Sequence, residues 1–199
     1  FGEGGGRGEG EPAASALSAR LRDWRAAGCP GGRDGLLDAL AQRGDFYVPR
    51  FYEVRYGSAH QIERVAAIRP GLPAAVRRWV LTELDEWPYP KAPIVPLAET
   101  VHERYSVEMF RGCSRGCRFC QAGMITRPVR ERSLDTIRSM VDAGRSATGL
   151  AEVGLLSLSS ADHSQIGPLA STLAQDLDGS NVSLSIPSTR VDAFSVELA

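Results

Sequence analysis

Lysine, long apolar runs and the features of a secretory signal are scarce or missing in this 199-residue sequence. Only Lys91 among the 23 basic residues is a lysine, a bias typical of GC-rich coding and not of selection for arginine chemistry. No run approaches the roughly 20 apolar residues of a membrane span, so we expect no membrane association. Residues 1–11 are rich in Gly and Glu, with neither a basic nor an apolar region, which is not the pattern of a signal peptide.

Charge and cysteine content narrow the possible functions further. The 23 Lys and Arg residues against 24 Asp and Glu residues exclude a global attraction to nucleic acid or anionic membrane. Of four cysteines, Cys29 lies alone in a turn-rich stretch, whereas Cys113, Cys117 and Cys120 follow one another with the spacing C-x3-C-x2-C. Clustered cysteines without a secretory signal indicate a reducing compartment and a metal-binding or catalytic role. We therefore expect a cytoplasmic protein.

Both ends of the chain read as interrupted. The sequence begins at Phe1 and not at Met, and residues 196–199 fall inside an expected helix. We therefore expect this chain to be a fragment of a longer protein.

Residues 1–98 predict a mixed helical and extended region. Helices are expected over 13–27 and over 35–42 with Asp34 as N-cap, and an extended segment over 46–56. The four prolines of residues 87–96 exclude a helix and predict an extended segment, called here the proline-rich strap. This strap is taken as the boundary before a second domain, residues 99–199.

The second domain alternates between strand and helix patterns. Strands are expected over 104–110, 152–158 and 182–186, and helices from Ser133 to about Gly144, over 164–177 and over 191–199. This alternation predicts α/β architecture, with βαβ units, a parallel sheet and right-handed crossovers. Because ligands bind at the carboxyl ends of such strands, the loops after residues 110, 158 and 186 should share one edge.

Three thiolates at the end of a strand can hold three irons of a [4Fe–4S] cluster and leave the fourth iron open to another ligand. A structural zinc site would need four ligands, usually in paired C-x2-C sets, and there is no second pair. Neither His102 nor His163 lies at a distance along the sequence from the cysteines that is typical of a fourth zinc ligand. Zinc is therefore the less favoured interpretation, and a disulfide is weaker still because one of three cysteines would be left over.

Seven arginines accompany the cysteines, against two acids. These arginines are Arg111, Arg115, Arg118, Arg127, Arg130, Arg132 and Arg138. They could bind nucleic acid, compensate an anionic cluster, or form solvated salt bridges such as Arg138 with Asp135. Nucleic acid is the least favoured, because no aromatic residues beyond Phe119 interleave with the arginines. The alternative function is thus a structural zinc or iron–sulfur module that binds nucleic acid through its arginine-rich loop.

The pattern C-x3-C-x-Φ-C, with Phe119 at Φ, resembles the radical SAM motif. The stretches VEMFRGCSRGCRFCQAGMITRPVRERS, EVGLLSLSSADHS and SLSIPSTRVDAFSVELA, together with WPYPKAPIVP, resemble the uncharacterised B12-binding-domain radical SAM protein family. The resemblance covers roughly the last three-fifths of the chain strongly and the remainder more loosely. It implies that residues 99–199 are the first part of a partial (β/α) TIM barrel. Residues 1–98 would be the tail of a cobalamin-binding-like domain and a linker.

The resemblance also implies roles for individual residues. Cys113, Cys117 and Cys120 would ligate a [4Fe–4S] cluster whose open iron chelates the amino and carboxylate groups of S-adenosylmethionine (SAM). Phe119 would lie against the adenine. Many members of the superfamily carry a Gly-Gly-Glu stretch that holds the SAM amino group, and this chain has Ser-Leu-Ser-Ser in its place.

The remaining SAM contacts would come from loops after the second and third strands. These candidates are Ser157, Ser159, Ser185, Ser188 and Arg190. Arg190 suits a carboxylate because a guanidinium can bind it bidentately. The alternative is that Ser185 is simply a small strand residue and Arg190 simply a surface charge.

The expected activity is reductive cleavage of SAM to a 5′-deoxyadenosyl radical, with an electron from a flavodoxin- or ferredoxin-like donor. The resemblance assigns no catalytic side chain in these residues and leaves the substrate and the reaction open, and we expect the fragment alone to be inactive. Cobalt ligation often uses D-x-H-x-x-G, whereas Asp162, His163 and Gly167 form D-H-x-x-x-G. Cobalamin would therefore bind only through an upstream domain, and not to this chain alone.

Overall fold

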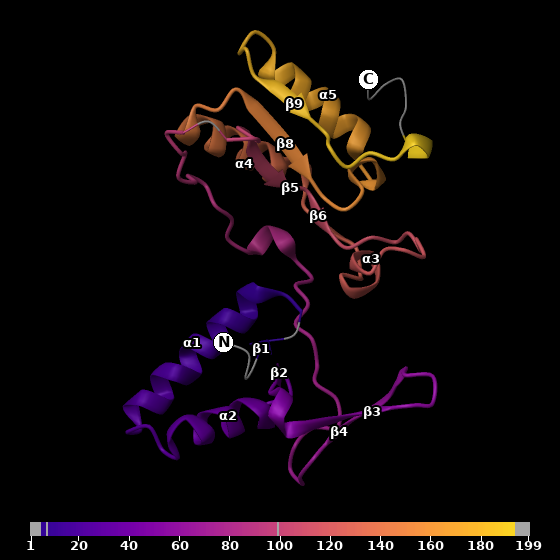
Figure 1. Cartoon of the computed structure of the whole chain (residues 1–199). Coiled ribbons are helices and arrows are strands. Elements are labelled where there is room, and N and C mark those ends of the chain that lie inside the picture. Colours follow the sequence, from indigo (N-terminus) through magenta and orange to yellow (C-terminus); the bar gives the residue numbers. More distant parts are fainter. Residues whose placement is uncertain (1–4, 7, 99, 194–199) are drawn as a thin grey trace. The chain divides into compact units, whose positions relative to one another are not determined.

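The computed structural model describes residues 5, 6, 8–98 and 100–193 (Figure 1). The chain forms two compact units, Phe1–Leu81 and Thr82–Ala199. The predicted domain boundary between residues 98 and 99 stays a prediction. The assignment of residues 1–98 to the tail of a cobalamin-binding-like domain stays a prediction.

The first unit combines two helices with two short antiparallel ladders. Its elements are β1 (Gly5–Gly6), α1 (Gly10–Ala26), α2 (Gly32–Gln42), β2 (Phe46–Tyr47), η1 (Pro49–Phe51), β3 (Tyr52–Tyr56) and β4 (Ile62–Ala67). Strand β1 pairs with β2, and β3 forms a hairpin with β4. The expected helix start at Asp34 is wrong, because α2 begins at Gly32 after the left-handed Gly31. Asp34 lies in the first helical turn and accepts a hydrogen bond from Arg50 at 2.6 Å.

The second unit is a mixed α/β domain built on a parallel sheet with strand order β5-β8-β9, as the strand and helix alternation predicts (Figure 1). Its main strands and crossover helices are β5 (Tyr105–Glu108), α4 (Leu134–Thr148), β8 (Glu152–Leu156), α5 (Ile166–Leu177) and β9 (Ser183–Ser185). Short elements complete it: η2 (Leu84–Glu86), β6 (Phe110–Arg111), α3 (Ala122–Ile125), β7 (Arg130–Glu131), η3 (Ser160–Asp162) and η4 (Val191–Ala193). The expected last helix coincides with η4 only, and its remainder lies outside the described residues.

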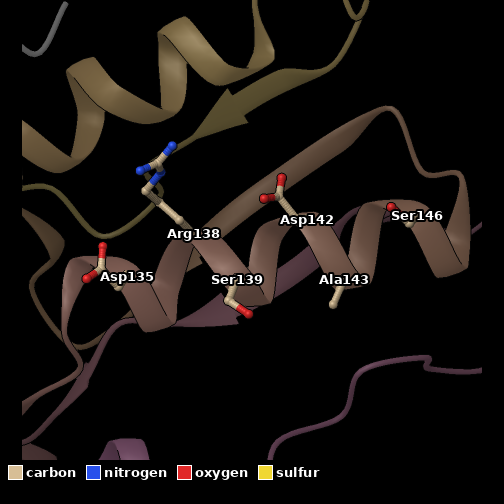
Figure 2. Close-up of a pocket in the computed structure, with 6 residues that line it drawn as sticks. All are labelled: Asp135, Arg138, Ser139, Asp142, Ala143 and Ser146. Atoms are coloured by element: carbon tan, nitrogen blue, oxygen red, sulfur yellow. The ribbon is translucent and has the colours of Figure 1, made fainter.

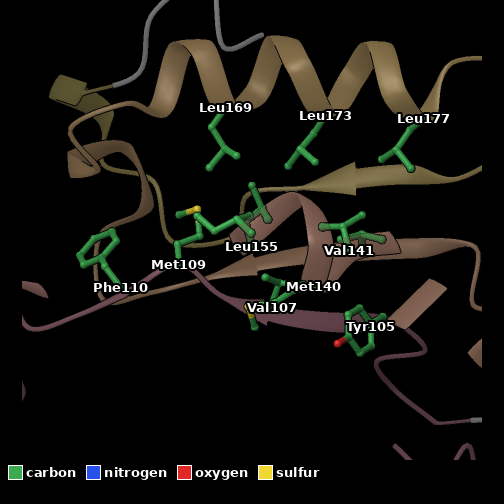
Figure 3. Packing of buried hydrophobic residues seen from close by; sticks show 12 residues of the cluster. Tyr105, Val107, Met109, Phe110, Met140, Val141, Leu155, Leu169, Leu173 and Leu177 are labelled. Carbon is green, nitrogen blue, oxygen red and sulfur yellow. The ribbon is translucent and has the colours of Figure 1, made fainter. Parts of the chain in front are cut away.

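Apolar side chains from the sheet and both crossover helices form one core in this unit (Figure 3). Figure 3 shows Leu169, Leu173 and Leu177 pointing from α5 toward the strands, one helical turn apart. Val107 and Leu155 are directly paired in the register of β5 and β8, and both are fully buried. Because the core fixes these three strands, it also fixes the edge at which their carboxyl ends emerge.

Helix α4 begins where the sequence predicts but ends later. Thr136 donates its backbone N–H to the hydroxyl of Ser133 at 3.2 Å, so Ser133 is the N-cap. The expected end near Gly144 is wrong, because α4 continues to Thr148 and is capped by Gly149 in the left-handed conformation. Gly144 instead lies in the helix interior, against the ring of Tyr105.

None of the helices within the described ranges is long and apolar enough to cross a membrane.

Candidate functional site

The three clustered cysteines lie on a loop, called here the cysteine loop (residues 112–129), that leaves and rejoins the domain at one place. Strands β6 and β7 form an antiparallel ladder at its base, with Phe110 opposite Glu131. The loop opens with Gly112 at a φ of 93°. A Cβ at that position would lie 2.4 Å from the carbonyl oxygen of Pro128, so the tight start of the loop requires glycine.

An arginine inside the cysteine loop holds its first half in place. The Nε of Arg127 donates to the carbonyl of Cys113 at 3.1 Å. Its Nη2 donates to the carbonyls of Ser114 and Arg115 at 3.3 and 3.0 Å. Three consecutive carbonyls therefore converge on one guanidinium, whose several N–H donors in a fixed plane suit such a set.

The cysteine sulfurs are partly exposed and reduced. The backbone N–H of Arg115 donates to the Sγ of Cys113, and that of Gly123 to the Sγ of Cys120, both at 3.4 Å. A Cβ on Gly123 would lie 3.7 Å from the Cβ of Cys113 and 3.8 Å from the Sγ of Cys120, so both cysteines flank this glycine. Hydrogen bonds to sulfur are among the contacts that tune iron–sulfur clusters.

The donor set fits a cluster in ligand type and in its place on one loop. Soft thiolates are the ligands that iron–sulfur clusters and zinc prefer. In the described part of the chain, however, no three His, Cys, Asp or Glu side chains are gathered closely enough to hold a metal ion. Cys113, Cys117 and Cys120 therefore share a loop without converging on one point in this conformation.

Phe119 occupies the turn between the second and third cysteines, and its side chain is 92% exposed. Nothing in this arrangement tests the expected contact with adenine, which stays a prediction.

Asp162 connects the cysteine loop to the loop after β8 (residues 157–165). Its carboxylate accepts from the Nε of Arg115 at 2.9 Å and from a second nitrogen of the same guanidinium. Ser159 donates its hydroxyl to the carboxylate at 2.7 Å, and a nitrogen of Arg190 lies 3.9 Å away. The hydrogen bonds from Arg115, with help from Ser159 and the charge of Arg190, lower the pKa of Asp162 to about 2. Asp162 is therefore an anion at neutral pH.

The loop after β9 (residues 186–190) joins the same edge of the sheet. The backbone N–H of Ser160 donates to the carbonyl of Ser188 at 2.7 Å. Arg190 pairs with Asp192, its Nε lying 3.0 Å from the carboxylate, and also approaches Asp162. The loops that follow β8 and β9 thus lie side by side, as the topology of a parallel sheet requires.

The serines expected to bind SAM lie at this edge, but several of their hydroxyls already contact protein groups. The hydroxyl of Ser157 lies 3.0 Å from that of Ser160 and accepts from the N–H of Ser159 at 3.2 Å. Ser159 is buried and bonded to Asp162. Ser185 ends β9 half-buried. Their roles as ligand contacts stay predictions.

Most arginines around the cysteine loop bind protein groups. Hydrogen bonds or ion pairs involve Arg111 with Glu108, Arg115 with Asp162, Arg127 with three carbonyls, Arg130 with the carbonyl of Thr126, Arg132 with Glu108 and Leu84, and Arg138 with Asp176. Arg118 alone among the seven has no such partner within the residues that the structure describes. The cluster therefore serves the fold and the loop more than it forms a free cationic surface.

The expected salt bridge between Arg138 and Asp135 is wrong. Figure 2 shows both along a hollow on the outer side of α4, with Arg138 extending toward α5. Its Nε and Nη2 donate to the carboxylate of Asp176 at 2.8 and 3.0 Å. The packing of α5 beside α4 supplies this partner, which local sequence spacing does not reveal.

His163, which follows Asp162, is buried and satisfied by backbone groups. Its Nδ1 accepts from the N–H of Gln165 at 3.1 Å, and its Nε2 lies 3.4 Å from the carbonyl of Arg132. Because Nδ1 accepts, Nε2 carries the proton. The imidazole is thus part of the packing beneath the cysteine loop, where it also lies near Phe110.

Asp162 is the residue of this site that the sequence interpretation missed. In the sequence it belongs to D-H-x-x-x-G, a pattern whose spacing does not match cobalt ligation. An acid that follows a buried strand at the ligand-binding edge was the signal that could have identified it.

Comparison with known proteins gives one family match that spans these loops. The family model of the radical SAM superfamily matches residues 107–199, slightly less than half of the chain. This match supports the radical SAM superfamily. The matched segment starts in β5 and contains the cysteine loop and the loops after β8 and β9. Proteins of that superfamily are enzymes that use an iron–sulfur cluster and SAM.

A relative among curated proteins adds little about function. An uncharacterized protein of Methanocaldococcus jannaschii is 33% identical over 94 residues, which cover 47% of this chain and 20% of that protein. The chain thus spans about a fifth of the length of this relative. Neither match distinguishes the B12-binding subfamily from other radical SAM proteins.

Proposed function

We propose that the second unit is the SAM-cleaving part of a radical SAM enzyme, in which Cys113, Cys117 and Cys120 hold three irons of a [4Fe–4S] cluster. Such a cluster, when bound, would supply the electron that cleaves SAM reductively to methionine and a 5′-deoxyadenosyl radical. The observation that carries this proposal is one loop, opened by Gly112, with three partly exposed thiols at the carboxyl edge of a parallel sheet.

The chain's own residues would prepare the site. Arg127 fixes the carbonyls of the first half of the cysteine loop, and this limits the loop's freedom before any ligand binds. Phe119 would lie against the adenine. Ser157 and Ser159 would contact the SAM amino group from the loop after β8, and Ser185 and Ser188 its ribose. Arg190 would bind the SAM carboxylate in exchange for Asp192.

The wider setting is also part of the proposal. The second unit would form the first strands of a partial TIM barrel, in a protein of the B12-binding-domain radical SAM family. Residues 1–98 would be the tail of the preceding domain, and cobalamin, if used, would bind outside this chain. A flavodoxin- or ferredoxin-like protein would deliver the electron. The residues of this chain leave the substrate undefined.

The rival function, a zinc or iron–sulfur module that binds nucleic acid, is less well supported. Phosphate binding needs cationic side chains that face solvent. Six of the seven arginines around the cysteine loop instead contact carbonyls or carboxylates of the protein.

Anaerobic reconstitution of the full-length protein tests the proposal directly. With iron and sulfide we expect about four irons per chain at this site, and with dithionite and SAM the formation of 5′-deoxyadenosine. Iron is quantified by chelation and 5′-deoxyadenosine by chromatography. Stoichiometric zinc together with an absence of SAM cleavage would overturn the proposal in favour of the rival module.

Arg127→Lys should loosen the cysteine loop. A lysine ammonium lacks the planar set of donors that reaches three carbonyls at once. We expect the reconstituted variant to lose iron to a chelator several-fold faster than wild type. Arg118→Lys is the matched control, because Arg118 is an exposed arginine of the same loop and should release iron at the wild-type rate. Equal rates for the two variants would contradict the role of Arg127.

A further inference from the structure

We propose that Asp162 is a positioning residue that sets the separation between the cysteine loop and the loops after β8 and β9. This inference rests on the proposed function, because that separation matters only if SAM binds between these loops. It concerns SAM binding and not the holding of iron, so the two can be tested apart.

The carboxylate of Asp162 lies among side chains from three different loops. Arg115 approaches from the cysteine loop and donates two hydrogen bonds, one of them from Nε at 2.9 Å. Ser159 donates from the loop after β8, and Arg190 lies 3.9 Å away beyond the end of β9. One anion therefore connects the ends of three chain segments that are adjacent in space and distant in sequence.

The element that carries Asp162 is itself firmly held. Asp162 ends the short helix η3, whose Ser160 is fully buried. Ser160 donates its N–H to the carbonyl of Ser188 at 2.7 Å and its hydroxyl to the carbonyl of Leu155 at 3.2 Å. These bonds attach η3 to the end of β8 and to the loop after β9. Asp162 is thus fixed to the sheet edge, and the cysteine loop is the part that it restrains.

Arg115 transmits this restraint to the cysteines. Its side chain binds Asp162, while its backbone N–H donates to the Sγ of Cys113 at 3.4 Å. Its carbonyl accepts from Arg127 at 3.0 Å. A displacement of the Arg115 side chain would therefore shift the cysteine loop as a whole relative to the loops after β8 and β9.

Loss of the Arg115–Asp162 pair should weaken SAM binding more than it weakens iron binding. SAM would bridge the cluster and the loops after β8 and β9, so its affinity depends on the spacing between them. The thiols belong to one loop that Arg127 and the β6–β7 ladder hold independently of Asp162. Iron binding should therefore survive the loss of Asp162.

The test compares Asp162→Asn with Asp176→Asn in the full-length reconstituted protein. Asp176 receives a similar two-point hydrogen bond from Arg138 between α4 and α5, away from the site, and is the matched control. For Asp162→Asn we expect a KM for SAM raised about tenfold or more, with kcat less affected. Its iron content and unfolding midpoint should equal those of Asp176→Asn. SAM should also perturb the electron paramagnetic resonance spectrum of the reduced variant less than that of wild type.

Three further variants extend the test, and Arg115→Lys and Asp162→Glu keep it decisive if Asp162→Asn folds poorly. Arg115→Lys should raise the KM for SAM in the same way, and the double variant Arg115→Lys with Asp162→Asn should add little, because the two residues form one contact. Asp162→Glu should restore part of the affinity. Among the variants that fold, a KM equal to that of Asp176→Asn, or a loss of iron in parallel with the rise in KM, would overturn the inference. A wild-type protein without iron or SAM cleavage would instead refute the proposed function on which it rests.

Discussion

Alanine in place of any one of Cys113, Cys117 and Cys120 is expected to reduce iron retention sharply and to lower 5′-deoxyadenosine formation to background. Each of these thiolates would hold a different iron, so no remaining side chain of the loop replaces a lost one. Because the three thiols are only partly buried, their removal should change the unfolding midpoint of the apoprotein little. The measurement is iron and sulfide content after reconstitution, followed by product analysis with SAM and dithionite.

Cys29→Ala supplies the matched control for these variants. Cys29 is an exposed free thiol in the turn between α1 and α2, in the first unit. We expect wild-type iron content and wild-type SAM cleavage from this variant. Retention of a full cluster by any of the three loop variants, or its loss in Cys29→Ala, would show that the cysteine loop is not the iron site.

The second large effect is expected at Gly144, in the interior of α4. A Cβ at this position would lie 2.0 Å from ring carbons of Tyr105, far inside van der Waals contact. The ring cannot retreat freely, because Tyr105 is buried and its hydroxyl donates to the carbonyl of Pro90 at 2.9 Å. Overpacking costs up to about 3 kcal/mol, against about 1 kcal/mol gained from helix propensity. Gly144→Ala should therefore lower the free energy of unfolding by about 2 kcal/mol.

Gly167→Ala isolates the steric effect from helix propensity. Gly167 is also a helical glycine, in α5, and a Cβ there would meet no described atom within 4 Å. We expect this variant to be as stable as wild type or slightly more so, as measured by urea denaturation followed by circular dichroism. Combining Gly144→Ala with Tyr105→Leu should recover part of the loss, since the smaller side chain vacates the contact. Equal stability of the two alanine variants would refute the packing role of Gly144.

The fold of the second unit could be predicted where local sequence determines it. The buried apolar pattern of β8 and the N-cap at Ser133 are both encoded within a few residues. Where a contact between residues distant in sequence decides the local structure, the prediction from sequence was wrong. Arg138 pairs with Asp176, 38 residues away, because α5 packs beside α4. Gly144 looked like a helix end, but it is required by the approach of Tyr105, which precedes it by almost 40 residues.

In the candidate site, too, local patterns could be predicted from the sequence and long-range side-chain contacts could not. The spacing of the three cysteines is a local pattern, and it identified the cysteine loop without structural information. Asp162 could not be paired with Arg115 from sequence, because the pair joins loops 47 residues apart. The topology rule placed both loops at one edge, yet only the folded chain reveals which side chains meet there.

The way in which residues 84–90, which lead into the proline-rich strap, are attached has an evolutionary consequence. Arg132 donates to the carbonyl of Leu84, the N–H of Ser133 to the carboxylate of Asp85, and Tyr105 to the carbonyl of Pro90. These contacts hold the chain up to Pro90, and β5 begins again at Tyr105. Between them, Ile94, Leu97 and Val101 are almost fully exposed. Since both ends are anchored and loop closure costs little per added residue, homologues can gain or lose residues over 91–103 without disturbing the sheet.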